Sequence, residues 1–157
     1  MFDRFMSAKD APSGSLAECY ITIDGVRYNF MQLYSFESKF NTNVSEVPIL
    51  GRTSKGHKYT GGSGEWSGTA HYNQSIMREL MYKYQETGEI TYFDIQVTNE
   101  DPATSVGRQT IILRDCLCDS AILAKYDADS ANLTEELSGT FERFEMPEKF
   151  NVLEGML

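Results

Sequence analysis

The chain has 157 residues and a formal net charge of -9, a length that suits one domain with a hydrophobic core and is short for two. Hydrophobic residues make up 41% of the sequence, which is too apolar for a disordered chain. The acidic balance argues against a surface that binds nucleic-acid phosphates, because such binding relies on clustered Lys and Arg.

Residues 1–16 contain a cluster of Pro, Ser and Gly and predict a flexible N-terminal arm before a single domain over residues 17–157. The first ten residues place charges among the apolar ones, so they do not resemble a signal peptide. No apolar run approaches the roughly 20 residues that cross a bilayer. We therefore expect a cytoplasmic protein without direct membrane insertion.

The first predicted element is a β-hairpin. Its arms read AECYITI and VRYNFMQLYSFESKF on either side of Asp24-Gly25, and Asp-Gly between apolar runs is the strongest short-range hairpin signal. The second arm, which ends at Phe40, is unusually long for a strand. A glycine-rich stretch over residues 51–69 follows it.

A helix is predicted over residues 73–87. Its apolar residues repeat at helical spacing on one face: Ile76, Met77, Leu80, Met81 and Tyr84. Asn73 is suited to cap its start, Gly88 to end it, and Glu79 to pair with Lys83.

The rest of the chain predicts strands. ITYFDIQVT alternates, with Phe93, Ile95 and Val97 on one face, and RQTIILRDCLCDSAILAKYD and LTEELSGTFERFEM favour further strands. Six to eight strands and one helix predict a mainly β fold, a β-sandwich or barrel-like structure with one flanking α-helix.

The glycine-rich stretch begins almost like a phosphate-binding loop. Gly51 and Gly56 have the right separation, but His57 stands where the lysine must be and Lys58 where the hydroxyl must be. The later glycines also disfavour an immediate helix. We therefore expect no nucleotide site and no other cofactor.

Catalytic and metal motifs are incomplete. His57 and His71 are the only histidines, and Ser63 lies in Gly-Gly-Ser-Gly without completing a nucleophile elbow. Cys116 and Cys118 are too close in sequence for the usual structural zinc pairs, so together with Cys19 they favour buried, reduced thiols. Asp127 and Asp129 begin like a calcium loop but lack its glycine and final glutamate, which favours a solvated acidic face.

Two segments resemble the tail tube proteins of phage-like element PBSX, a branch of the contractile-tail tube family. They are SEVPILGRTSKGHKYTGGSGEWSGTAHY, followed by a helix, and AKYDADSANLTEELSGTFERFEMPEKF. The resemblance runs from the first hairpin to Pro147-Glu148-Lys149. It implies a non-enzymatic subunit that forms hexameric rings, stacked into a hollow tube inside a contractile sheath.

The resemblance also implies partners: other copies of the chain, the sheath protein, and baseplate and tape-measure proteins. It implies assembly in a bacterial cytoplasm and a final place in a virion tail or a released bacteriocin particle. An acidic lumen would let DNA pass without sticking.

By position, a long loop at about residues 41–65 would contact other subunits, and the glycines would let it adapt to a neighbour. The candidate positions in this loop are Gly51, Arg52, Lys55, Gly56, His57, Lys58 and Tyr59. Asn29 and Gln32 would face a lumen, and Arg78, Glu79 and Lys83 would face the sheath.

Two other classes remain open. One is a monomeric β-barrel that binds a small ligand in an apolar interior cavity. The other is a hydrolase that uses His57 or His71.

Overall fold

A computed structural model describes residues 5–156, which contain eight β-strands and one α-helix. The strands pair antiparallel throughout. This confirms the predicted mainly β class with one helix. After a 3₁₀ turn at Ala8–Asp10, the elements are β1 (Ala17–Ile23), β2 (Val26–Asn29), β3 (Leu33–Val47), β4 (Gly56–His71), α1 (Ile76–Thr87), β5 (Phe93–Glu100), β6 (Arg108–Ser120), β7 (Thr134–Phe141) and β8 (Arg143–Glu148).

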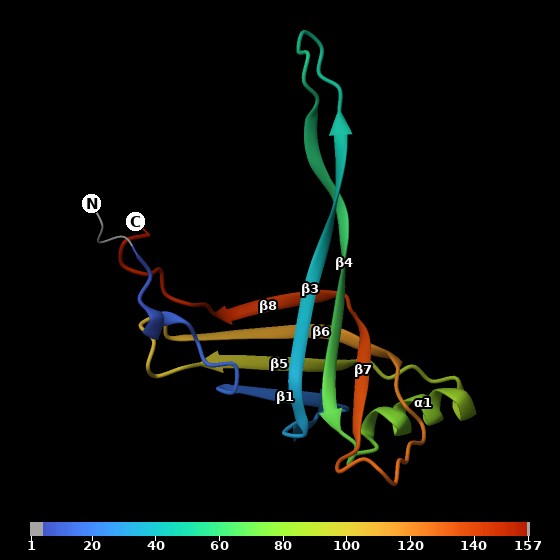
Figure 1. Ribbon diagram of the computed structural model, residues 1–157. Helices are drawn as coiled ribbons and strands as arrows, with labels where there is room; N and C mark the ends of the chain where they lie inside the picture. The colour runs from blue at the N-terminus through green and yellow to red at the C-terminus, as the bar shows by residue number, and fades with distance from the viewer. Residues whose placement is uncertain (1–4, 157) are drawn as a thin grey trace.

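The strands form two layers that cross each other and share β6 (Figure 1). One layer has the order β2-β1-β5-β6-β8 and the other the order β6-β7-β4-β3. The first part of β6 pairs with β5 as far as Cys116, and Leu117 begins the pairing with β7. Between them Asp115 adopts a φ of 55°, which is uncommon for a residue other than glycine. The register shift here marks a bulge, and bulges bend a strand, so β6 passes from one layer into the other.

The hydrophobic core fills the space between the layers. Ile21, Ile95 and Leu113 come from the first layer and are almost fully buried. Trp66 comes from β4, and its ring meets Phe93 of β5 edge-on with centroids 6.1 Å apart. With 3% of its surface exposed, Trp66 belongs to the core.

The predicted first hairpin is confirmed at its turn but not in its second arm. Ile23 pairs with Val26 around Asp24-Gly25. The second arm divides at Phe30, which is buried in the core and whose carbonyl accepts a hydrogen bond from Leu33 N. β2 therefore stays beside β1, whereas β3 crosses to the other layer. The predicted last strand divides in the same way into β7 and β8.

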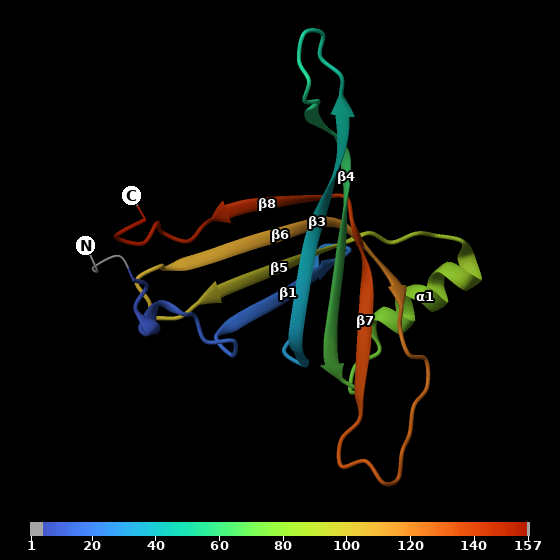
Figure 2. The ribbon, with the colours of Figure 1, turned by 45° about the horizontal axis from the view of Figure 1, so that its top comes forward.

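The helix α1 lies at one end of the β7 layer (Figure 2). It begins at Ile76, later than predicted, and neither Asn73 nor Ser75 makes the expected capping bond. Gly88 adopts the predicted left-handed conformation and its N–H donates to Tyr84 O at 2.8 Å. Instead of Glu79, Lys83 pairs with Glu89, at 3.2 Å.

The N-terminal segment is attached to the loop after β5. Ser13 N donates to Asp101 at 2.9 Å, and both the N–H and the hydroxyl of Ser105 donate to Asp10. These hydrogen bonds lower the pKa of Asp10. The segment predicted as a flexible arm is thus bonded to the domain at Asp10 and Ser13, and residues 1–4 lie outside the described range.

Candidate assembly surface

The most exposed part of the molecule is the far half of the β3–β4 hairpin. β3 and β4 pair from Leu33 to Val47 of β3, but β7 accompanies β4 only between His71 and Gly64. β3 ends the strand order of the described chain. Residues 41–63 therefore form a two-stranded ribbon without a third strand, here called the distal ribbon, which projects far beyond both layers (Figure 1).

The distal ribbon corrects the loop predicted at residues 41–65. Most of this segment is paired strand, and only residues 48–55, here called the tip, connect the two strands. Valines, threonines and a tyrosine favour extended backbone here. The glycine-rich composition suggested a loop, but the one irregularity in the pairing is an extra residue in β4 near Gly61, whose φ is 131°.

Several glycines of β4 make room for aromatic side chains. From the sequence we expected them to let a loop adapt to a neighbouring subunit. A Cβ on Gly64 would overlap the Phe141 ring, and one on Gly62 would lie 2.7 Å from the Phe40 ring. Because glycine has no side chain, the Phe141 and Phe40 rings can pack directly against the backbone of β4. Gly51 differs, because its φ of 85° helps the chain reverse at the tip.

The distal ribbon has no hydrophobic core of its own. None of its residues is buried. The exposed fraction is 57% for Val44 and 73% for Tyr59, and Leu50 is fully exposed. An isolated two-stranded hairpin is only marginally stable in water. Its free edges also present unpaired backbone groups to other chains. These features favour a surface that is stabilised by a protein partner.

The charge of the distal ribbon differs from that of the rest of the chain. It carries three cations, Arg52, Lys55 and Lys58, and one carboxylate, Glu46. Lys55 and Glu46 form an exposed pair at 3.3 Å. Since the whole chain has a net charge of -9, a basic ribbon projects from an acidic body. Such complementarity favours the docking of one copy on another.

The structure brings the seven predicted loop positions together. Gly51, Arg52 and Lys55 lie in the tip, and residues 56–59 begin β4. Sequence reasoning missed Ile49 and Leu50, which form the apolar end of the tip. The available signal was a short apolar run, Pro48-Ile49-Leu50, at the turn of a mostly polar segment.

The positions predicted to face the lumen and the sheath differ in how exposed they are. Asn29 is exposed at the end of the edge strand β2, whereas Gln32 is 8% exposed and its carbonyl accepts from His71 N. Arg78 also lies inward, because it pairs with the buried Glu135 at 2.6 Å. Of the three positions expected to face the sheath, Glu79 and Lys83 reach solvent.

The structure keeps the two histidines apart. His57 and His71 lie at opposite ends of β4, about 45 Å apart at roughly 3.3 Å per residue. Burial raises the pKa of the thiols of Cys19 and Cys116 to about 12 and that of Cys118 to about 11. Over residues 5–156, His, Cys, Asp and Glu form no group arranged to hold a metal. In the same range, no helix is long and apolar enough to span a bilayer.

A comparison with protein families matches residues 4–148 to the family described as Phage tail tube protein. The chain is 38% identical to Phage-like element PBSX protein XkdM of Bacillus subtilis (strain 168), over 74% of this chain and 80% of that protein. It is 37% identical to Uncharacterized protein YqbM of the same strain, over 73% of this chain and 78% of that one.

Solved structures resemble the fold at lower identity. A chain of the anti-feeding prophage baseplate superposes with a TM-score of 0.63 at 14% identity, covering 97% of this chain and 100% of that one. A chain of the sheath-tube complex of an extracellular contractile injection system, in its extended state, gives a TM-score of 0.62 at 11% identity, covering 92% and 93%. These likenesses show the same fold.

Proposed function

Because the chain belongs to the phage tail tube protein family, we propose that its copies form hexameric rings that stack into a hollow tube inside a contractile sheath. The chain is a structural, non-enzymatic component of a phage-like tail particle. The distal ribbon is the observation that carries the proposal, since it exposes apolar residues and free strand edges that a neighbouring copy would cover.

Assembly would cover the free strand edges of the isolated subunit. The strand order of the described chain ends at β2 on one side and β3 on the other. Open edges invite uncontrolled pairing, and closure of a sheet into a ring eliminates them. Contacts between different surfaces of identical subunits generate rings when they close and filaments when they do not. Both kinds of contact are needed in a tube made of rings.

The proposed particle has further components. A sheath protein would surround the tube, with exposed positions such as Glu79 and Lys83 facing it, and baseplate and tape-measure proteins would act in tube assembly. The similar solved chains come from a baseplate and a sheath-tube complex, which supports the sheath and baseplate partners. The tube would assemble in a bacterial cytoplasm and end in a virion tail or a released bacteriocin particle.

We also propose an acidic lumen, in keeping with the chain's net charge of -9. Asn29 lies on the exposed edge strand β2 and is our candidate for a lumen position; Gln32 would need to become uncovered on assembly. A lumen lined by carboxylates would repel phosphates, so that DNA could pass without binding. A neutral or basic lumen in an assembled tube would overturn this part of the proposal.

Electron microscopy of the purified protein over a range of concentrations tests the proposal. We expect six-fold rings, and hollow tubes at higher concentration. A protein that stays monomeric, even when expressed together with sheath and baseplate proteins, would contradict it. The alternative of a ligand-binding barrel needs an enclosed apolar cavity, whereas the space between the layers is filled by the core around Trp66, Phe93 and Leu113.

A further inference from the structure

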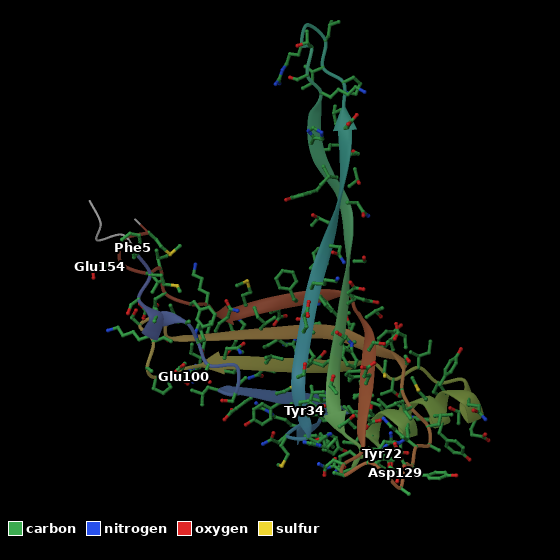
Figure 3. The ribbon with its side chains drawn as sticks, in the orientation of Figure 1. Phe5, Tyr34, Tyr72, Glu100, Asp129 and Glu154 are labelled. Atoms are coloured by element: carbon green, nitrogen blue, oxygen red, sulfur yellow. The ribbon has the colours of Figure 1, made fainter. Side chains whose placement is uncertain are left out.

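The two ends of the subunit carry features that complement each other. The tip lies at the top of Figure 1, whereas α1 lies at the side of the lower part of the body, next to β7. Tyr72 and Asp129 mark the α1 end, and the labelled residues show how far it lies from the distal ribbon (Figure 3). Copies stacked along the distal ribbon would bring the tip of one copy to the part of the next copy that contains α1 and the segment between β6 and β7 (Figure 1).

The α1 end contains an apolar surface groove of about 390 Å³. Its walls come from four parts of the chain: α1, the segment after it, the start of β5 and the last part of β6. We call it the α1 groove. Its lining includes Leu80, Met81, Tyr84, Ile90, Leu117 and Cys118. Tyr84 is 58% exposed and Ile90 is 55% exposed, so part of this lining faces water in the single subunit.

The tip carries an exposed apolar side chain and basic residues. Ile49 folds back toward Gly56, with its Cδ1 3.0 Å from the position of an added Cβ, whereas Leu50 extends fully into solvent. Arg52 and Lys55 follow this leucine in the tip. The segments around the groove, residues 72–92 and 121–133, carry five carboxylates and three cations. An apolar side chain with basic neighbours thus corresponds to an apolar groove with acidic surroundings.

We propose that Leu50 of one copy inserts into the α1 groove of a second copy in the next ring. The inference rests on the proposed tube function and specifies one contact that holds successive rings together. Because this contact joins two different surfaces, it repeats without closing and builds a filament. It also covers the fully exposed Leu50 and the part of the groove lining that faces water. This burial gives a hydrophobic contribution to stacking.

The first test replaces Leu50, whose side chain is so exposed that the fold does not depend on it. Leu50→Asp should preserve six-fold rings and raise the concentration needed for tubes about tenfold or more, because a leucine side chain loses its burial. Thr53→Asp is the matched control, since it adds the same charge to the same tip without removing the apolar side chain. Equal losses of stacking in both variants, or tubes from Leu50→Asp at the usual concentration, would overturn the inference.

The second test maps the contact by disulfide trapping in a Cys118→Ser background. Copies with Leu50→Cys, mixed with copies carrying Ile90→Cys, should cross-link in tubes under mild oxidation. Val26→Cys is the control partner, because Val26 is exposed to a similar extent (52%) on the distant strand β2.

The outcomes separate the inference from the proposed function. Tubes without the Leu50–Ile90 cross-link, or with an equal cross-link to residue 26, would overturn the inference and leave the tube function standing. Normal tubes that lose only sheath binding on Leu50→Asp would overturn it too, in favour of a sheath contact. Absence of any rings or tubes from the unaltered chain would remove both proposals.

Discussion

Trp66 and Gly139 lie directly opposite each other on the paired strands β4 and β7, and a Cβ added to Gly139 would lie 2.7 Å from Nε1 of the indole. The same Cβ would also overlap the carbonyl oxygen of Leu117 on β6. The absence of a side chain at residue 139 thus allows the tryptophan to pack where β4, β7 and β6 meet.

Gly139→Ala should therefore destabilise the subunit by about 1 to 3 kcal/mol, the usual cost of inserting a methyl group into a packed site. Urea unfolding followed by Trp66 fluorescence measures this change. Gly14→Ala is the control, since an added Cβ there has nothing within 4 Å, and its effect should stay within about 0.5 kcal/mol. Equal stabilities of the two variants would contradict the packing argument.

The ion pair between Arg78 and Glu135 attaches α1 to β7. Glu135 is 4% exposed at its side chain and Arg78 is 16% exposed. Arg78→Ala should lower the free energy of unfolding by about 3 kcal/mol, because it leaves a buried carboxylate without its partner. Thermal and urea unfolding both report this loss.

Two further variants make that prediction specific. Lys83→Ala breaks an exposed pair with Glu89 and should cost at most about 1 kcal/mol. Arg78→Leu combined with Glu135→Leu should recover much of the lost stability, because no unpaired charge remains buried. A double variant as unstable as Arg78→Ala would show that the charge is not the cause.

Acid should weaken the pairing of β8 with β6. Arg114 donates to Glu145 at 3.0 Å and to Asp94 at 2.7 Å, and its hydrogen bond lowers the pKa of Glu145 below the ordinary value of 4.5. The resulting stability is present above that value and is lost as the pH falls through the lower pKa of the folded state. Carboxyl NMR titration should find the lowered pKa, and Glu145→Gln should reduce the loss of stability in acid. A folded-state pKa at or above 4.5 would contradict the assignment.

Amide hydrogen exchange should divide the hairpin in two. In the single subunit, amides of the distal ribbon should exchange fast, because few buried contacts support their hydrogen bonds. Amides of β4 from Glu65 onward should be protected, since β7 pairs with this part. In assembled tubes the distal ribbon should become protected as well. A ribbon that is already protected in the monomer, or still unprotected in the tube, would conflict with its role as an interface.

Local patterns in the sequence were sufficient for several elements. The alternation around Phe93 and Ile95 predicted the buried face of β5, and Asp24-Gly25 and Gly88 predicted the turn and the helix end. The division of the second hairpin arm could not be predicted from the sequence, because it depends on the burial of Phe30 among residues far away in sequence. The bulge at Asp115 likewise reflects the packing of two layers and has no local signal.

The candidate assembly surface could be predicted only in part from the sequence. The resemblance pointed to residues 41–65, and all seven loop positions predicted there lie in the distal ribbon. Its strand conformation was missed because Gly62 and Gly64 were counted as flexible, whereas they make room for Phe40 and Phe141. The inward position of Arg78 depends on Glu135, 57 residues away, and no spacing rule connects the two.

The pairing of β4 with β7 has a mechanical consequence. A pull on the distal ribbon along its length acts parallel to β4 and β7, and the hydrogen bonds between these strands lie across that direction. Gly64, where the ribbon enters the paired part of β4, lies opposite Phe141 at the end of β7, and His71 lies opposite Thr134 at its start. A pull between the tip and Leu133, just before β7, therefore loads many of these bonds at once. We expect single-molecule pulling in this geometry to show one rupture at high force, and stepwise low-force unzipping would disprove this load path.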